Sequence, residues 1–200
     1  MSNHRKNIMV ETAQRYVDAG TFSGIEWQVQ HRGALCHTGS VGRAGCDSLA
    51  PIPDQAIYRI YSMTKPIVAA MAVILLQENR LHLFDPVAKF ISEFKDPSIL
   101  HSNGTREKAT VPITIEHLLT HRAGLSYDFL PDCPVGALYR EARLAEDGHR
   151  SLTDFVNDLA AMPLAFNPGS RWQYSCSIDV LARVIEIVTD EPIGAVLDRY

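Results

Sequence analysis

The sequence lacks a long hydrophobic segment and an excess of basic charge. Its longest apolar run, residues 67 to 76, reaches only about half of the roughly 20 residues that a membrane-spanning helix needs. With 19 Lys and Arg against 23 Asp and Glu, the formal net charge is −4, and the chain has no basic stripe typical of a nucleic-acid surface. We therefore expect neither a membrane nor a nucleic acid as a partner.

Cysteine is scarce, and its positions favour no metal site. The four cysteines form neither a Cys-x-x-Cys pair nor a Cys/His cluster, so the sequence indicates no zinc site and no disulfide framework; they are Cys36, Cys46, Cys133 and Cys176. The first 15 residues also lack the apolar centre of a secretory signal. Because disulfides follow the redox compartment, we expect free thiols and a cytoplasmic location.

The composition is that of an ordinary globular chain: of its 200 residues, 46% are hydrophobic and 21% are charged. The apolar periodicity predicts a helix over residues 5 to 19, strands over 25 to 30 and 34 to 38, and a loop from Gly39 onward. A short strand is expected over residues 57 to 60. The helix that follows, from Met63, is apolar on every face, and we expect it to be buried at the centre of the fold.

The second half of the chain reads as mainly helical. Residues 81 to 94 predict a short turn and helix, 95 to 110 a polar loop, and 125 to 149 a long irregular segment. Thr114 and Ser151 are candidate N-caps of two further helices. Two last helices are expected behind Ser175 and Pro192, and no stop signal follows the final one, so we expect a truncated chain.

The candidate for chemistry is the tetrad that begins with Ser62 and ends with Lys65, at the start of the apolar helix. This spacing places a hydroxyl and an amine on one helix face, and a serine needs a nearby proton acceptor before it becomes a nucleophile. Ser92 and Lys95 repeat the spacing among charged neighbours, where a surface serine is the simpler interpretation. An ordinary first-turn lysine is the alternative for Lys65.

A lysine must lose its proton to act as a base. Its pKa would have to fall by about three units to be half neutral near pH 7, and burial can supply part of that fall. A second titrating group would help, and Tyr174 is the candidate. Local sequence leaves open that Tyr174 is a packed tyrosine bonded to backbone.

Four segments of the chain form a combined pattern, namely Tyr61-Ser62-Met63-Thr64-Lys65-Pro66, residues 81 to 87, residues 113 to 125 and Pro168-Gly169-Ser170-Arg171-Trp172-Gln173-Tyr174-Ser175. In order and spacing they resemble the serine β-lactamase-related hydrolases, most closely the class C β-lactamase-like esterases and penicillin-binding-protein homologues. The resemblance spans nearly the whole chain.

The resemblance implies roles for particular residues. Ser62 would be the acylated nucleophile, Lys65 its proton-transfer partner, and Tyr174 a base or relay coupled to the lysine. The Ser62 backbone N–H would supply half of an oxyanion hole. Tyr127 and Phe129 would line the substrate pocket, although they are equally compatible with the core. No metal or cofactor is implied.

Two further positions, His117 and His121, resemble scaffold positions of the family, and we interpret both as structural.

Two features depart from the family pattern. The tyrosine motif often carries an asparagine two residues after the tyrosine, where this chain has Cys176. A thiol cannot supply both an amide donor and a carbonyl acceptor, so substrate recognition at this position favours an esterase over a β-lactamase. Family members also continue into further helices, the rest of the main sheet and a closing helix, none of which follows Tyr200.

The sequence therefore predicts an α+β fold of the β-lactamase/transpeptidase type, with N-terminal sheet strands and a helical region but without the remainder of the main sheet. We expect one incomplete domain over residues 1–200, with its sheet side in 1–61 and its helical region in 62–200. The expected function is serine hydrolysis of carboxylic esters or related small acyl compounds. The alternatives are a β-lactamase or D-alanyl-D-alanine carboxypeptidase, and a catalytically incompetent homologue that only binds.

Overall fold

The computed structural model describes residues 2–146 and 150–200. The chain forms two compact units, Met1–Arg59 and Ile60–Tyr200. Within the described residues no helix has the length and apolar character needed to cross a membrane.

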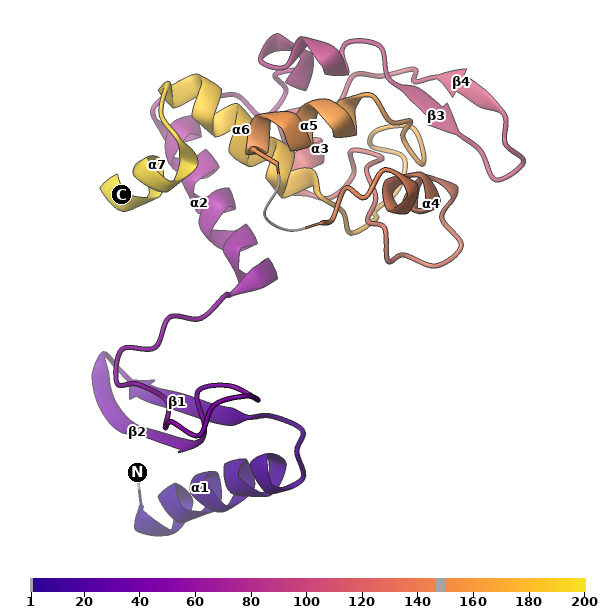
Figure 1. Cartoon of the computed structure of the whole chain (residues 1–200). Helices are drawn as coiled ribbons and strands as arrows, with labels where there is room; N and C mark the ends of the chain where they lie inside the picture. Colours follow the sequence, from indigo (N-terminus) through magenta and orange to yellow (C-terminus); the bar gives the residue numbers. More distant parts are fainter. Residues whose placement is uncertain (1, 147–149) are drawn as a thin grey trace. The chain divides into compact units, whose positions relative to one another are not determined.

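The described residues of the first unit, from Ser2 onward, form one helix and one hairpin (Figure 1). Helix α1 (Asn3–Asp18) precedes strands β1 (Gly24–His31) and β2 (Ala34–Gly42), which pair antiparallel with an irregularity between Val29 and Gln30. The helix and both strands were predicted from apolar periodicity, and the structure confirms them.

Strand β2 is longer than predicted because Gly39 lies inside it rather than in a loop. Gly39 pairs with Trp27 of β1, and a Cβ at this position would collide with the Trp27 ring. The glycine is therefore where the strand makes room for a large cross-strand neighbour, which is one of the recognised uses of glycine within a strand.

The second unit is mainly helical (Figure 1). Its α-helices are α2 (Thr64–Gln77), α3 (Ile115–Leu119), α4 (Pro134–Glu141), α5 (Leu152–Ala160), α6 (Ser177–Thr189) and α7 (Ile193–Arg199). Three single-turn 3₁₀ helices, η1 (Tyr61–Met63), η2 (Val87–Lys89) and η3 (Ser92–Phe94), and the hairpin β3 (Ser98–Leu100) and β4 (Arg106–Lys108) complete it.

Helix α6 is the centre of this unit. It packs against α2, α3, α5 and α7, and seven of its residues are buried, namely Ser177, Ile178, Val180, Leu181, Ala182, Val184 and Ile185. The prediction that α2 is buried on every face is wrong within this unit. Its buried stripe is Val68, Met71, Ala72 and Leu75, whereas Ile67 and Val73 are 46% and 45% exposed.

The predicted strand over residues 57 to 60 is absent. Ile57 is 99% exposed, so the apolar pattern there is not buried as a strand requires. The polar loop contains the β3–β4 hairpin, the irregular segment contains α4, and residues 81 to 94 form two 3₁₀ turns instead of one helix. The caps at Thr114 and Ser151 are confirmed, because each side-chain oxygen accepts the N–H three residues later.

Candidate active site

Ser62 lies in the 3₁₀ turn η1, directly before α2. Tyr61, the residue before it, has a φ of +45°, a left-handed conformation that costs a bulky residue about 1 to 3 kcal/mol and occurs often at functional sites. The Lys65 Nζ donates to the Ser62 Oγ at 3.3 Å. The local spacing predicted this pair, but it gave no signal for the strained backbone at Tyr61.

The duplicate tetrad lacks this arrangement. The Ser92 Oγ donates to Glu93 at 3.2 Å, and both Ser92 and Lys95 are exposed. This agrees with the interpretation of Ser92 as a surface serine.

Two tyrosines from distant parts of the chain lie against Lys65. The Lys65 Nζ is 5.4 Å from the Tyr127 ring centroid and 5.1 Å from that of Tyr174. Burial alone would lower the pKa of Lys65, but hydrogen bonds with both tyrosines outweigh it and the pKa is raised. The sequence-based expectation of a lowered lysine pKa is therefore wrong, because the partners that stabilise the ammonium come from far along the chain. Lys65 is a cation at neutral pH.

The pKa values of the two tyrosines are shifted in opposite directions. Burial raises the pKa of Tyr127 to about 12, against the opposing effect of Lys65. Burial would also raise the pKa of Tyr174, but hydrogen bonds with Ser62 and Lys65 outweigh it and the pKa of Tyr174 is lowered. Paired groups whose pKa values are driven apart are typical of acid and base assignments. Tyr174 is thus the group suited to accept a proton, and Tyr127 stays a neutral phenol.

A cavity of about 710 Å³ opens at Ser62; we name it the Ser62 cavity. Tyr127, Phe129, Tyr174 and Cys176 all line it, so the predicted site residues share one space with Ser62 and Lys65. Phe129 is stacked on Tyr127, with centroids 4.8 Å apart and an interplanar angle of 19°. The rest of the lining is largely apolar and includes Leu144, Leu152, Phe155, Ile178, Ala182 and Leu197.

Two of the charged groups around the Ser62 cavity form ion pairs of their own. Glu146 is paired with Arg143, and Arg150 is 3.3 Å from Asp158. Asp179, in the first turn of α6, was not singled out in the sequence. Burial raises the pKa of Asp179, against the opposing charge of Lys65.

Cys176 is buried at the start of α6. Its thiol donates to the Ser126 carbonyl oxygen at 3.1 Å, and burial raises its pKa well above the ordinary value. A protonated, internally bonded thiol is a poor nucleophile. Cys176 therefore offers no amide-like recognition of a substrate and is not suited to act as a second nucleophile.

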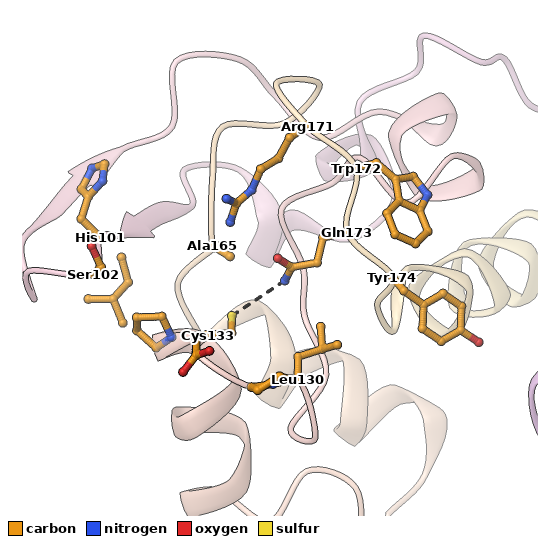
Figure 2. Close-up of a pocket in the computed structure, with 13 residues that line it drawn as sticks. His101, Ser102, Leu130, Cys133, Ala165, Arg171, Trp172, Gln173 and Tyr174 are labelled. Atoms are coloured by element: carbon orange, nitrogen blue, oxygen red, sulfur yellow. Dashed lines mark hydrogen bonds between the residues drawn. The ribbon is translucent and has the colours of Figure 1, made fainter.

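A second hollow, of about 670 Å³, is lined by residues 171 to 174 of the segment that carries Tyr174, together with residues that include His101 and Cys133 (Figure 2). Figure 2 shows the Tyr174 hydroxyl pointing away from this hollow, whereas the Gln173 amide reaches Cys133. The same amide donates to the Ser126 Oγ at 3.0 Å. Gln173, which the sequence did not mark, thus ties the Tyr174 segment to the loop that carries Tyr127.

The two histidines have different surroundings. His117 completes the capping box of α3, because its Nδ1 accepts the Thr114 N–H at 3.3 Å and its own N–H is donated to the Thr114 Oγ1 at 3.3 Å. His121 instead lies with its ring centroid 4.9 Å from that of Tyr174. The sequence analysis interpreted both His117 and His121 as structural.

Comparison with known proteins identifies the family. Residues 9–200 match the Beta-lactamase family, so the chain belongs to it, and the fold is of the β-lactamase/transpeptidase type.

Individual relatives agree with this assignment. Esterase EstB of Burkholderia gladioli is 35% identical over 175 residues, which are 85% of this chain and 42% of EstB. Protein Rv1367c of Mycobacterium tuberculosis is 32% identical over 186 residues, covering 91% of this chain and 45% of that protein. The solved structure of EstCE1, a hydrolase with promiscuous acyltransferase activity, superimposes with a TM-score of 0.76 at 29% identity, over 94% of this chain and 48% of EstCE1. The chain thus spans about half the length of these relatives.

We predict that Tyr174 has the tyrosine hydroxyl that ionises at the lowest pH. Replacing Lys65 by Met removes the cation and its hydrogen bond, so the pKa of Tyr174 should rise. Ultraviolet titration at the tyrosinate band measures this pKa, and the phase that disappears in Tyr174→Phe is assigned to Tyr174. Lys89→Met is the control, because Lys89 is an exposed lysine paired with Asp85. An unchanged low-pH phase in Lys65→Met would contradict the assignment.

Proposed function

We propose that the protein is a serine hydrolase that cleaves carboxylic esters through an acyl-enzyme on Ser62. The observation that supports it most is the group of Ser62, Lys65 and Tyr174, in which a lysine with a raised pKa stabilises a tyrosine with a lowered one. The esterase and hydrolase relatives support the same class of reaction.

In the proposed mechanism, the Tyr174 phenolate accepts the Ser62 hydroxyl proton while the Ser62 Oγ forms a bond to the ester carbonyl carbon. The Lys65 ammonium stabilises the Tyr174 phenolate before this step. Lys65 and Tyr174 interact strongly, so the two groups titrate as a coupled pair. The tetrahedral intermediate then loses its alkoxide, which takes the proton from Tyr174, and the acyl group remains on Ser62.

A water molecule completes the cycle. It gives a proton to Tyr174 as it attacks the acyl carbon, and the Ser62 oxygen leaves and regains that proton. The backbone N–H of Ser62 is the proposed donor to the oxyanion, where one donor is worth about 3 to 4 kcal/mol.

The Ser62 cavity supports an ester with an apolar acyl group. Its lining beyond the polar end is largely apolar, and its charged neighbours Glu146 and Arg150 are already paired. Asp179 would repel an acyl group that carries a carboxylate. The cavity therefore suits a neutral hydrocarbon chain better than a charged one.

The alternative within the family, a β-lactamase or D-alanyl-D-alanine carboxypeptidase, is less well supported. Cys176 replaces the amide-bearing residue of the pattern, and its thiol is already donated to the Ser126 carbonyl. Acylation by a labelled penicillin, without turnover of simple esters, would reverse this preference.

Replacing either Ser62 or Lys65 by Ala is expected to lower ester hydrolysis by about 10³-fold or more, because the nucleophile or the ion that stabilises its base is removed. Turnover of p-nitrophenyl acetate measures the effect. Ser92→Ala, the same change in the duplicate tetrad, should retain activity within about twofold.

Retained turnover in Ser62→Ala would rule out the acyl-enzyme. If the unaltered protein shows no turnover and no acylation, the proposed function is wrong and the alternative of a catalytically incompetent homologue is favoured.

Lengthening the acyl group from acetate to hexanoate is expected to raise kcat/KM by up to about fourfold per methylene, the value for full burial of a CH₂. Ala182→Leu, which fills part of the Ser62 cavity, should abolish most of this gain and leave acetate little affected. Ala160→Leu, the same change on α5 outside the cavity lining, is the matched control. Equal chain-length profiles for the two variants would show that the acyl chain lies elsewhere.

A further inference from the structure

His121 contacts four consecutive residues of the segment that carries Tyr174. Its carbonyl oxygen accepts a hydrogen bond from the Gln173 N–H at 2.9 Å, and its Nδ1 lies 3.3 Å from the Ser175 Oγ. Its ring centroid is 4.9 Å from that of Tyr174, at an interplanar angle of 47°, and 6.4 Å from that of Trp172. His121 thus contacts the backbone of Gln173, the ring of Tyr174 and the side chain of Ser175.

The backbone of His121 adopts an uncommon conformation while making these contacts. Its φ is +54°, in the left-handed region that residues other than glycine seldom occupy, although His, Asn and Asp do so more often than most. Such a conformation persists only where the surrounding contacts enforce it. Here it belongs to the turn that ends α3, in which the His121 N–H donates to the Leu118 carbonyl oxygen at 3.3 Å and the Arg122 N–H to the His117 carbonyl oxygen at 2.8 Å.

The hydrogen bond to Ser175 continues into the core. The Ser175 Oγ lies 2.7 Å from the Ser177 Oγ, and these two serines are 1% and 0% exposed. Ser177 is the first residue of α6. His121, which is partly buried, and the buried Ser175 and Ser177 therefore form a polar chain that joins the end of α3 to the start of α6, next to Tyr174 in the sequence.

The charge state of His121 fits this position. Burial lowers the pKa of His121, and the Lys65 ammonium lowers it further. The ring is therefore neutral at pH 7, so it places no second cation beside Lys65 and leaves one ring nitrogen protonated for hydrogen bonding.

We infer that His121 is a positioning residue that holds the Tyr174 hydroxyl toward Ser62 and Lys65. The inference rests on the proposed function, in which Tyr174 transfers the Ser62 proton. His121 does not touch the reacting atoms. It acts through the Tyr174 ring and the backbone and side chain on either side of it.

A purely structural histidine would stabilise the unit without affecting the titration of Tyr174. The groups that face Tyr174 are Ser62 from η1, Lys65 from the first turn of α2, Tyr127 from the loop after α3, Asp179 from α6, and His121 itself. Displacing the tyrosine ring changes its distance to Lys65 and Ser62, whose hydrogen bonds lower its pKa. The titration of Tyr174 therefore reports its position independently of stability.

The test compares His121→Asn with His117→Asn in the purified protein. Asparagine tolerates the left-handed backbone but removes the ring from Tyr174. His117, in the helix α3 that ends just before His121, contacts Thr114 instead and provides the matched control. The readouts are kcat and KM for p-nitrophenyl acetate, the thermal midpoint, and the tyrosinate titration with its Tyr174 phase assigned by Tyr174→Phe.

We expect His121→Asn to lower kcat by about 10- to 100-fold, as small misplacements of a catalytic group do, with KM within about twofold. The pKa of Tyr174 should rise toward its ordinary value. His117→Asn should lower the thermal midpoint and leave both kcat and the Tyr174 titration unchanged. A folded His121→Asn with the parent kcat and the parent titration overturns the inference.

If His121→Asn does not fold, Ser175→Ala is read in the same way, since it removes the Nδ1 hydrogen bond and keeps the backbone contact. Different results would refute the proposed hydrolase function and the positioning role of His121. A parent protein without turnover, or a Tyr174→Phe variant with full turnover, refutes the proposed function. An unshifted Tyr174 titration refutes the role of His121 whether or not the protein turns over.

Discussion

The packing of α6 against α2 is the constraint on which the site depends. Ser62 lies in η1 directly before α2, Lys65 lies in the first turn of α2, and the Tyr174 segment leads directly into α6. Because the two helices contact each other, with Val68 and Ile178 buried near their N-terminal ends, Ser62 and Tyr174 are brought together although they are far apart in sequence. The buried face of α6 therefore organises the site as well as the core.

This packing places polar groups around the Lys65 ammonium, and they determine the protonation states in the site. Lys65 is surrounded by the hydroxyls of Ser62, Tyr127 and Tyr174, and these hydrogen bonds keep it charged. The charge in turn favours the ionised form of the more accessible tyrosine, Tyr174, while the more deeply buried Tyr127 remains a phenol. In the proposed mechanism, one cation and two unequally buried tyrosines are enough to make Tyr174 the base and to leave Tyr127 a neutral phenol.

Much of the fold was predictable where the signal is local. Thr114 and Ser151 are caps that act within one turn, and the spacing of Ser62 and Lys65 is a property of one helix end. The order of the helices followed from apolar periodicity. The resemblance of four segments to a family then indicated Tyr174, which no local pattern links to Ser62.

The misses share a physical cause, which is that they depend on contacts between distant segments. The pKa of Lys65 is set by Tyr127 and Tyr174, so an argument from burial alone gave the wrong direction. Gly39 reads as a loop residue until Trp27 is placed opposite it. The apolar run of α2 does not reveal which of its faces the rest of this unit covers.

The most direct measurement is the site of covalent modification after brief exposure to an activated ester or a fluorophosphonate. Mass spectrometry of the digested protein should find one adduct, on the peptide that contains Ser62, and the adduct should be lost in Ser62→Ala. An adduct on Cys133, on Cys176 or on Ser92, or no adduct at all, would contradict the account of Ser62 as an activated nucleophile.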